Sequence, residues 1–418
     1  MPHSGEDVVG FSVSRLPRLG VAGPSPARMS GLDAARGLAM LLVCAAHFAE
    51  VYFPRVGHPE VASAVRRLTY AATPSFILIS GVLLGVLQFD HRAAFDGTRR
   101  KLVDRALFLL TVAHFMNAAA YVSHVGMWDA LLVVHITDVV ACCVLVGTFV
   151  VAATSARTRA SFAIALYLAA TLVHFRWLPP VGSTLELLKH LFVGYRHHVE
   201  NNVFRSNFPI AQWTAAYLLA TVVGGLLARS RAQDGRPRIA SLVWLGAGLM
   251  TAGAFLRASR AGLARLLVLA HAGNADVVAF LTGWWQKFPP GSTYLLVYGG
   301  LALILVAGCL WLDSAHPSST ALRAPALLGC NSLFVFVAQQ YVYSLVYWLH
   351  LPFTRLWPMI FVSTVLLLGM LTVLWHRRRG HRLLTVGYPG LVARLERWWP
   401  VGVVEPARGT GEPAGRLT

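Results

Sequence analysis

Arg36 and His47 are the two residues of this 418-residue sequence whose types and spacing most directly suggest chemistry. They lie eleven positions apart in the apolar stretch GLDAARGLAMLLVCAAHFAEVYF. Eleven residues make about three turns of an α-helix, which puts both side chains on nearly one face, ~16 Å apart along the axis. One helical stripe therefore carries a fixed cation and a titratable base.

The two residue types suit different tasks. A guanidinium group at the inner mouth of a membrane protein suits a phosphorylated donor from the cytosol. A neutral imidazole deeper in the membrane suits proton abstraction from a hydroxyl or amino group. The structural alternatives are that Arg36 extends to the lipid headgroups and that His47 makes one hydrogen bond between helices. Asp33 lies three residues before Arg36, where it could orient the guanidinium or cap the helix.

Other ionisable residues also fall inside apolar runs. Such residues cost about 2.5 to 3.5 kcal/mol at a helix centre, so they carry an expectation of function. His114 and His135 are candidates for contact with substrate, with Asp138 three residues after His135 and able to orient its ring. Ser80 is a further candidate for substrate contact. For each of these residues, packing between helices is the alternative.

Ten apolar runs must position these residues. The sequence is 56% hydrophobic and only 13% charged, whereas soluble domains average about 25% charged. Runs of about 17 to 25 residues are long enough to cross a ~30 Å hydrocarbon core as helices. We therefore predict an all-α, polytopic membrane protein with about ten spans, near residues 37–53, 71–88, 106–122, 130–153, 160–175, 208–228, 240–256, 293–312, 324–349 and 356–375.

The net charge of +18 gives information about how the protein is oriented in the membrane. With the N-terminus in the cytoplasm, the tails and alternate loops carry about twice as many Lys and Arg residues as the opposite loops, which places both termini inside. The basic residues lack the interleaved aromatics of a nucleic-acid surface, so we expect anionic lipid headgroups as partners and no nucleic acid. We predict a disordered cytoplasmic tail over 1–30, a membrane domain over 31–376 and a basic cytoplasmic tail over 377–418.

Two outer segments, 176–207 and 257–292, are longer than a simple connection between packed helices requires. The first contains GYRHHVENNVFRSN, which suits a polar ligand such as a sugar or is an ordinary solvated loop. The adjacent His197 and His198 would point apart on a helix, and the five cysteines lack metal-ligand spacing. We expect no metal site, and no Gly-rich fingerprint indicates a nucleotide cofactor.

The opening LDAARGLAMLLVCAAH resembles the membrane acyltransferase superfamily, which includes the acyltransferase-3, OpgC-like and heparan-α-glucosaminide N-acetyltransferase-like proteins. The spacing of Arg36 and His47 matches the acyltransferase-3 signature. The resemblance covers residues 30–375. It continues through TPSFILISGVLLG (73–85), RALFLLTVAH (105–114), FPIAQW (208–213), QKFPPGSTYLL (286–296) and LGCNSLFVFVAQQ (328–340).

The resemblance implies transfer of an acyl group, most often acetyl, from cytosolic acyl-CoA to a hydroxyl or amino group of a glycan or other envelope acceptor. It implies His47 as general base or as a covalent carrier of the acyl group, and Arg36 at the donor site. It also implies the inner membrane of a bacterium, with acyl-CoA as co-substrate and no permanently bound cofactor. The RxxR pattern of the family's third span is absent, and the nearest basic groups, Arg100, Lys101 and Arg105, are the candidates for binding the donor there.

A secondary transporter is the alternative from another class, since about ten spans with buried charges describe many transporters. The sequence shows no inverted repeats with broken helices in matching positions, and its ionisable residues concentrate in the first four spans. This asymmetry favours one catalytic centre. A non-catalytic relative that only binds lipids or partner proteins is the third hypothesis, which the intact Arg36 and His47 disfavour.

Overall fold

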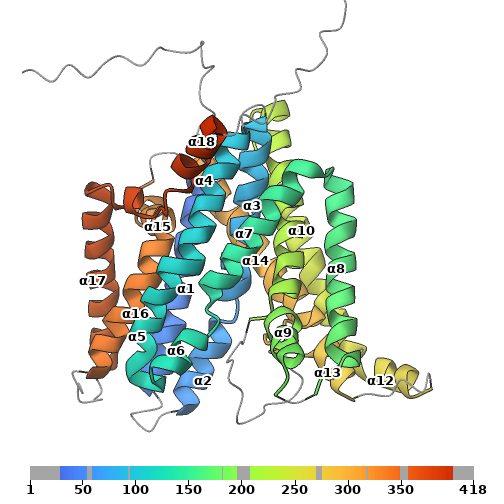
Figure 1. The fold of residues 1–418 in the computed structure, drawn as a ribbon. Coiled ribbons are helices and arrows are strands. Elements are labelled where there is room, and N and C mark those ends of the chain that lie inside the picture. Colours follow the sequence, from blue (N-terminus) through green and yellow to red (C-terminus); the bar gives the residue numbers. More distant parts are fainter. Residues whose placement is uncertain are drawn as a thin grey trace, which may run out of the picture.

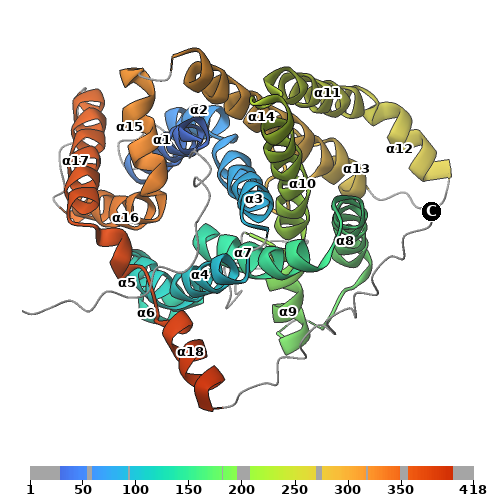
Figure 2. The same cartoon turned by 90° about the horizontal axis from the view of Figure 1, so that it is seen from above.

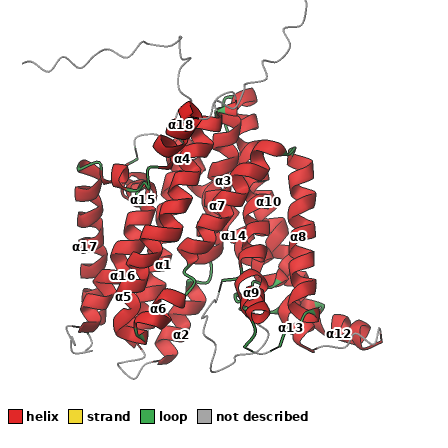
Figure 3. Cartoon of the chain, in the orientation of Figure 1, coloured by secondary structure: helices red, strands yellow, loops and turns green. Residues whose placement is uncertain are grey.

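The computed structural model describes residues 29–53, 59–92, 95–180, 182–194, 208–269, 275–316, 319–348 and 356–398. These residues form helices joined by short loops, and no strand occurs among them (Figure 3). The helices are α1 (Ser30–Tyr52), α2 (Pro59–Leu68), α3 (Ala72–Asp90), α4 (Phe95–Phe108), α5 (His114–Val125), α6 (Met127–Leu132), α7 (Ile136–Ala153), α8 (Ala156–Arg176), α9 (Thr184–Val193), α10 (Ile210–Asp234), α11 (Ile239–Ala258), α12 (Arg260–Leu269), α13 (Ala275–Thr282), α14 (Ser292–Ala315), α15 (Thr320–Cys330), α16 (Ser332–Trp348), α17 (Trp357–Arg377) and α18 (Tyr388–Trp398).

The prediction of about ten spans is confirmed. Within the described residues, nine helical segments are long and apolar enough to cross a membrane, and a bent pair of helices brings the number to ten. Most of the bounds agree with the predicted runs to within a few residues. The spanning helices stand side by side in one bundle (Figure 1).

The bent pair is a correction to the predicted uninterrupted span over 324–349. The chain turns by 79° between α15 and α16. Asn331 lies at the break, where its side-chain Nδ2 donates to the carbonyl of Leu327 at 2.8 Å and competes with the backbone for that acceptor. Pro325 adds to the irregularity, since proline has no N–H to donate within a helix.

Two further irregularities lie in the third and fourth spans. The third, predicted over 106–122, begins at Phe95 and contains a π-helical turn at Leu109–Ala113 between α4 and α5. In the fourth, residues 133–135 leave the helical conformation before α7 begins. The predicted run 130–153 therefore contains a break at its start, next to His135.

Helix α1 lies inside the bundle, where it contacts α3, α14, α15 and α16 (Figure 2). Its contact with α15 is made by backbone atoms. A Cβ atom added to Gly37 would lie 1.8 Å from the carbonyl oxygen of Pro325, and one added to Gly329 would lie 1.8 Å from that of Asp33. Small residues at such crossings let membrane helices approach closely.

The two ends of the bundle differ. Helix α1 begins at the same end as that on which α18 lies, and we call this end the terminal side (Figure 1). Helices α2, α6, α9, α12 and α13 lie at the opposite end, which we call the distal side. The segment predicted as a basic tail, 377–418, contains the helix α18, which packs on α4. The first turn of α1 is anchored by Asp313 of α14, which accepts from Ser30 Oγ and from Gly31 N.

The close crossing of α1 and α15 generates a stability prediction. We expect Gly37→Ala to destabilise the protein by about 1 to 3 kcal/mol, because the new methyl group forces two backbones apart. Thermal unfolding of the detergent-solubilised protein, followed by circular dichroism, measures the loss. Gly225→Ala is the matched control, since a Cβ there meets no atom within 4 Å. Equal midpoints for the two variants would contradict the prediction.

Candidate functional site

A cavity of about 620 Å³ lies in the distal half of the bundle. Its walls come from α1, α2, α3, α16, the break before α7 and the loop between α13 and α14. Such a volume falls in the range of small-molecule sites. The lining residues are Val43, Ala46, His47, Glu50, Arg66, Thr69, Tyr70, Ala72, Thr73, Phe76, Val133, Val134, His135, Ile136, Phe208, Trp285, Gln286, Lys287, Phe288, Phe336 and Gln340.

His47 is half-buried in the wall of this cavity. Its Nδ1 lies 3.4 Å from the amide nitrogen of Gln340, and its ring makes an edge contact with Phe336 at 5.9 Å between centroids. Both neighbours come from α16. A ring held through Nδ1 leaves Nε2 as the nitrogen available for chemistry.

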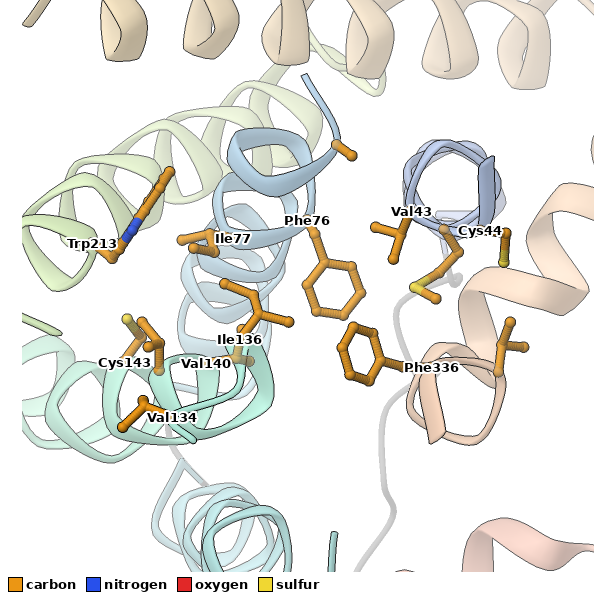
Figure 4. Close-up of a cluster of buried hydrophobic side chains, with 14 of the residues drawn as sticks. Val43, Cys44, Phe76, Ile77, Val134, Ile136, Val140, Cys143, Trp213 and Phe336 are labelled. Carbon is orange, nitrogen blue, oxygen red and sulfur yellow. The ribbon is translucent and has the colours of Figure 1, made fainter. Parts of the chain in front are cut away.

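Arg36 lies behind the cavity and is not part of its wall. Its guanidinium carbon stands 5.3 Å from the ring centre of Phe76, whose side chain does line the cavity. Phe76 thus separates the cation from the space that His47 faces. Figure 4 shows Phe76 of α3 and Phe336 of α16 pointing toward each other between α1 and α7. The ring of Phe76 is held in place by the surrounding core.

The surroundings of Arg36 are mostly apolar. It interacts electrostatically with Asp33, in the same helix, and with Arg105 of α4. Its Nε is buried and has no hydrogen-bond partner among the described residues. Asp33 is itself buried in the first turn of α1. The structure therefore brings Asp33, Arg36 and Arg105 together on the terminal side of Phe76.

The other basic candidates of α4 also stay out of the cavity. Lys101 is exposed and Arg100 is half-buried. Between them and Arg105, Asp104 accepts hydrogen bonds from the backbone N–H groups of Val386 and Tyr388, at 3.1 and 2.9 Å. The start of α18 is thereby attached to the helix that carries these three cations.

His114, His135 and Asp138 form one hydrogen-bonded junction, of which only His135 reaches the cavity. His114 Nδ1 lies 3.0 Å from Asp138 Oδ2, and its Nε2 lies 3.0 Å from the carbonyl oxygen of Leu131. The same Asp138 oxygen accepts from the backbone N–H of His135 at 2.8 Å, which caps α7. Both nitrogens of His114 are thus engaged in holding the broken fourth span.

Ser80 is buried and faces its own helix. Its hydroxyl donates to the carbonyl oxygen of Phe76 at 2.8 Å, and the residue is not part of the cavity wall. The polar residues expected in the first long outer segment, Arg196, His197, His198, Glu200, Asn201 and Asn202, lie outside the described residues. Within the described part of the chain, no group of three His, Cys, Asp or Glu side chains could hold a metal ion.

Sequence reasoning missed the distal wall of the cavity. Lys287 lines it, with its ammonium 4.8 Å from the ring centre of Phe288 and 5.4 Å from that of Phe208. Burial lowers the pKa of Lys287 to about 8, with Glu50 opposing and Arg66 adding to the change. Glu50 itself pairs with Arg66 at 3.5 Å. The available signal was the sequence WWQKFPPGS, a cation among aromatics in a long outer segment.

The role of Asp138 generates a second prediction. We expect Asp138→Ala to lower stability by roughly 2 to 4 kcal/mol, from the lost helix cap and the unsatisfied ring of His114. Asp96→Ala is the control, because that carboxylate is exposed and pairs with Arg99 at the surface, and such pairs contribute about 0 to 1 kcal/mol. Thermal unfolding in detergent measures both, and equal losses would show that Asp138 has no special structural role.

Comparison with known protein families identifies the family of the chain. The family model described as an acyltransferase domain, acyltransferase-3, matches residues 29–376. No curated protein matches the sequence. The matched region covers the described spanning helices, except for the last residue of α17, and includes all residues of the cavity wall. The chain therefore belongs to the acyltransferase-3 family of membrane acyltransferases.

Proposed function

We propose that this protein transfers an acyl group from a cytosolic acyl-CoA to a hydroxyl or amino group of an envelope glycan, with His47 as general base. The observation that carries the proposal is the position of His47 in the wall of a large cavity, with the cation Arg36 behind the adjacent ring of Phe76. Family membership supports acyl transfer over transport. We place the terminal side in the cytoplasm, because the tails and loops there are rich in Lys and Arg.

The donor would approach from the terminal side. Its phosphates would meet Arg36 and Arg105, with Arg100 and Lys101 nearby on α4, since guanidinium and ammonium groups bind phosphate through charge-assisted hydrogen bonds. The slender pantetheine arm would then pass Phe76 to bring the thioester to His47. A buried cation without a nearby hydrogen-bond partner for its Nε is consistent with a site completed by an anionic ligand.

The acceptor would occupy the cavity from the distal side. His47 takes the proton of the acceptor while the acceptor oxygen or nitrogen attacks the carbonyl carbon of the thioester. The new bond to carbon forms, the carbon–sulfur bond breaks, and His47 returns the proton to the departing thiolate of CoA. Gln340 would hold the ring in place. The structure places the amide nitrogen of Gln340 toward Nδ1. Turned end for end, the amide would present its oxygen to Nδ1–H and leave Nε2 as the base.

His135 faces the same cavity as His47 and would contact the acceptor. Its position is held by the cap that Asp138 provides at the start of α7. His114 would act through this junction only, as a positioning residue. A covalent acyl-His47 intermediate is the second form of the mechanism, in which the imidazole rather than the acceptor attacks the thioester first.

Thiol release by the purified protein tests the proposal. We expect His47→Ala to lower kcat by about 10² to 10⁴, the range for loss of a general base. We expect Arg36→Ala to raise the KM for acetyl-CoA more than it lowers kcat, because the donor phosphates lose a cation. Liposome-reconstituted protein, acetyl-CoA and a panel of sugar acceptors are used, with free thiol measured by colour reaction.

His316→Ala is the control for loss of a histidine, since His316 is exposed at the end of α14. It should leave the rate unchanged. Two results would overturn the mechanism: wild-type protein that neither binds nor turns over acetyl-CoA across the panel, or a His47→Ala variant with full activity.

A further inference from the structure

Lys287 has no carboxylate bound to it among the described residues. Among the described acids, Glu50 acts on Lys287 electrostatically, and it forms its ion pair with Arg66 instead. The ammonium of Lys287 lies against the rings of Phe208 and Phe288. Contact with aromatic faces offsets only part of the cost of removing a cation from water. Within the described residues, the cavity wall therefore holds a partly desolvated positive charge that is not paired with a carboxylate.

The loop that carries Lys287 is held in a fixed shape. Gly291 N donates to the carbonyl of Gln286 at 2.8 Å, and Lys287 N donates to that of Trp285 at 2.9 Å. The hydroxyl of Tyr167 in α8 donates to the carbonyl of Pro290 at 3.1 Å. These bonds tie the loop to itself and to the bundle, so the position of the ammonium is part of the fold.

An aromatic surface adjoins this charge. Trp285 lines the cavity and is still 48% exposed. The centroid of its ring lies 5.1 Å from the ring centroid of Tyr70, which lines the cavity as well. An open indole face suits the apolar face of a sugar ring, whose C–H groups are attracted to the negative face of the aromatic system.

We propose that Lys287 binds an acidic substituent of the acceptor, so that the cavity takes a sugar bearing a carboxylate or a phosphate, with its ring on Trp285 and a hydroxyl at His47. This inference rests on the proposed function, because it takes the cavity as the acceptor site. The donor phosphates are not the ligand of Lys287, since Arg36 and α4 lie on the other side of Phe76. The distal wall carries two basic side chains, Arg66 and Lys287, and one acidic side chain, Glu50, so its net positive charge favours binding of an anion.

Binding of matched sugars tests the inference without any turnover. Methyl glucuronide and methyl glucoside differ only at C6, where the first has a carboxylate and the second a hydroxymethyl group. Glucose 6-phosphate is the third sugar and tests a phosphate in place of the carboxylate. We expect wild-type protein at pH 7 to bind the glucuronide or the phosphate about tenfold or more tightly than the glucoside, as a charge-assisted hydrogen bond would give. Isothermal titration calorimetry in detergent measures the ratio, and the two anionic sugars show which acid is preferred.

Three variants assign this preference to Lys287. Lys287→Gln should bring the ratio close to one, while Lys287→Arg, which keeps the charge, should retain it. Arg265→Gln is the matched control, because it removes one exposed charge from α12 at the same end of the bundle. Equal binding of all three sugars by wild type, no binding of any, or a preference that survives Lys287→Gln would overturn the inference.

Lipid headgroups offer the same phosphate chemistry, so a further arm uses dihexanoylphosphatidylglycerol as competitor. Failure of this lipid to displace the anionic sugar is expected, and displacement would reassign the site to lipid. The outcome is separable from that of the proposed function. Preferential binding of the anionic sugar without thiol release would support the inference about Lys287 and contradict the acyl-transfer mechanism. Thiol release without a preference for the anionic sugar would support the mechanism and contradict the inference.

The titration of Lys287 gives a pH prediction. Because its pKa is lowered to about 8 by burial, the amine is mostly charged at pH 7 and mostly neutral at pH 9.5. Preference for the anionic sugar should therefore fall as pH rises through about 8, or slightly higher in the complex, since a bound anion favours the charged amine. Among the described residues, the charged or titratable side chains that line the cavity with Lys287 are His47 and Glu50 of α1, Arg66 of α2, Tyr70 and His135.

Lys287→Arg separates this effect from a general loss of binding. A guanidinium group stays charged to well above pH 10, so the variant should keep its preference at pH 9.5. The measurement is the ratio of dissociation constants for glucuronide and glucoside at pH 7, 8, 9 and 9.5. A ratio that is flat in wild type, or that falls equally in Lys287→Arg, would contradict the prediction.

Discussion

The contact between the backbones of α1 and α15 is the constraint on which the site depends. Helix α1 carries Arg36 and His47, and α15 leads directly into α16, which carries Phe336 and Gln340. In a bilayer, lipid tails are as apolar as the helices, so tight packing has to come from shape. Gly37 and Gly329 allow α1 and α15 to meet at backbone distance. The position of α16 relative to His47 follows from this contact and from the 79° turn after it.

The departures from regular helix lie where polar groups of the protein can satisfy the backbone. Irregular backbone at membrane depth is tolerated only in such places or along a cavity. At one break, His135 lines the cavity and Asp138 caps the following helix. At the other, Asn331 bonds its own preceding turn. Both breaks change the direction of the chain, so that a neighbouring segment turns toward the site.

Much of the fold could be predicted from the sequence, because apolar runs of sufficient length have few alternatives in a bilayer. The pairing of Arg36 and His47 along α1 could be predicted too, since helical periodicity fixes the face on which each lies. The break between α15 and α16 could not be placed, because Asn331 and Ser332 are one of two polar pairs in the run over 324–349, and the other pair, Gln339 and Gln340, lies inside α16. Periodicity also gives no information on which helices become neighbours.

The wall of the cavity was the least predictable part. Lys287 lies in a loop between helices, and only the folded chain shows that this loop reaches His47's cavity. Conversely, His114 and Ser80 looked like substrate contacts, and the structure places neither in the cavity wall. A buried polar residue in a span has two ways to satisfy its hydrogen bonds, through a ligand or through its neighbours, and the sequence alone does not distinguish them. Those two residues bond neighbouring backbone or side-chain atoms.

The ring of Phe76 has an electrical consequence. A cation on one side and a polar cavity on the other are separated here by apolar side chains, and a bare or hydrated ion gains nothing by entering such a layer. A membrane across which cells maintain a voltage cannot contain an open aqueous pore. With Phe76 and Phe336 pointing toward each other between the helices (Figure 4), the bundle can keep the two proposed sites apart while remaining an insulator.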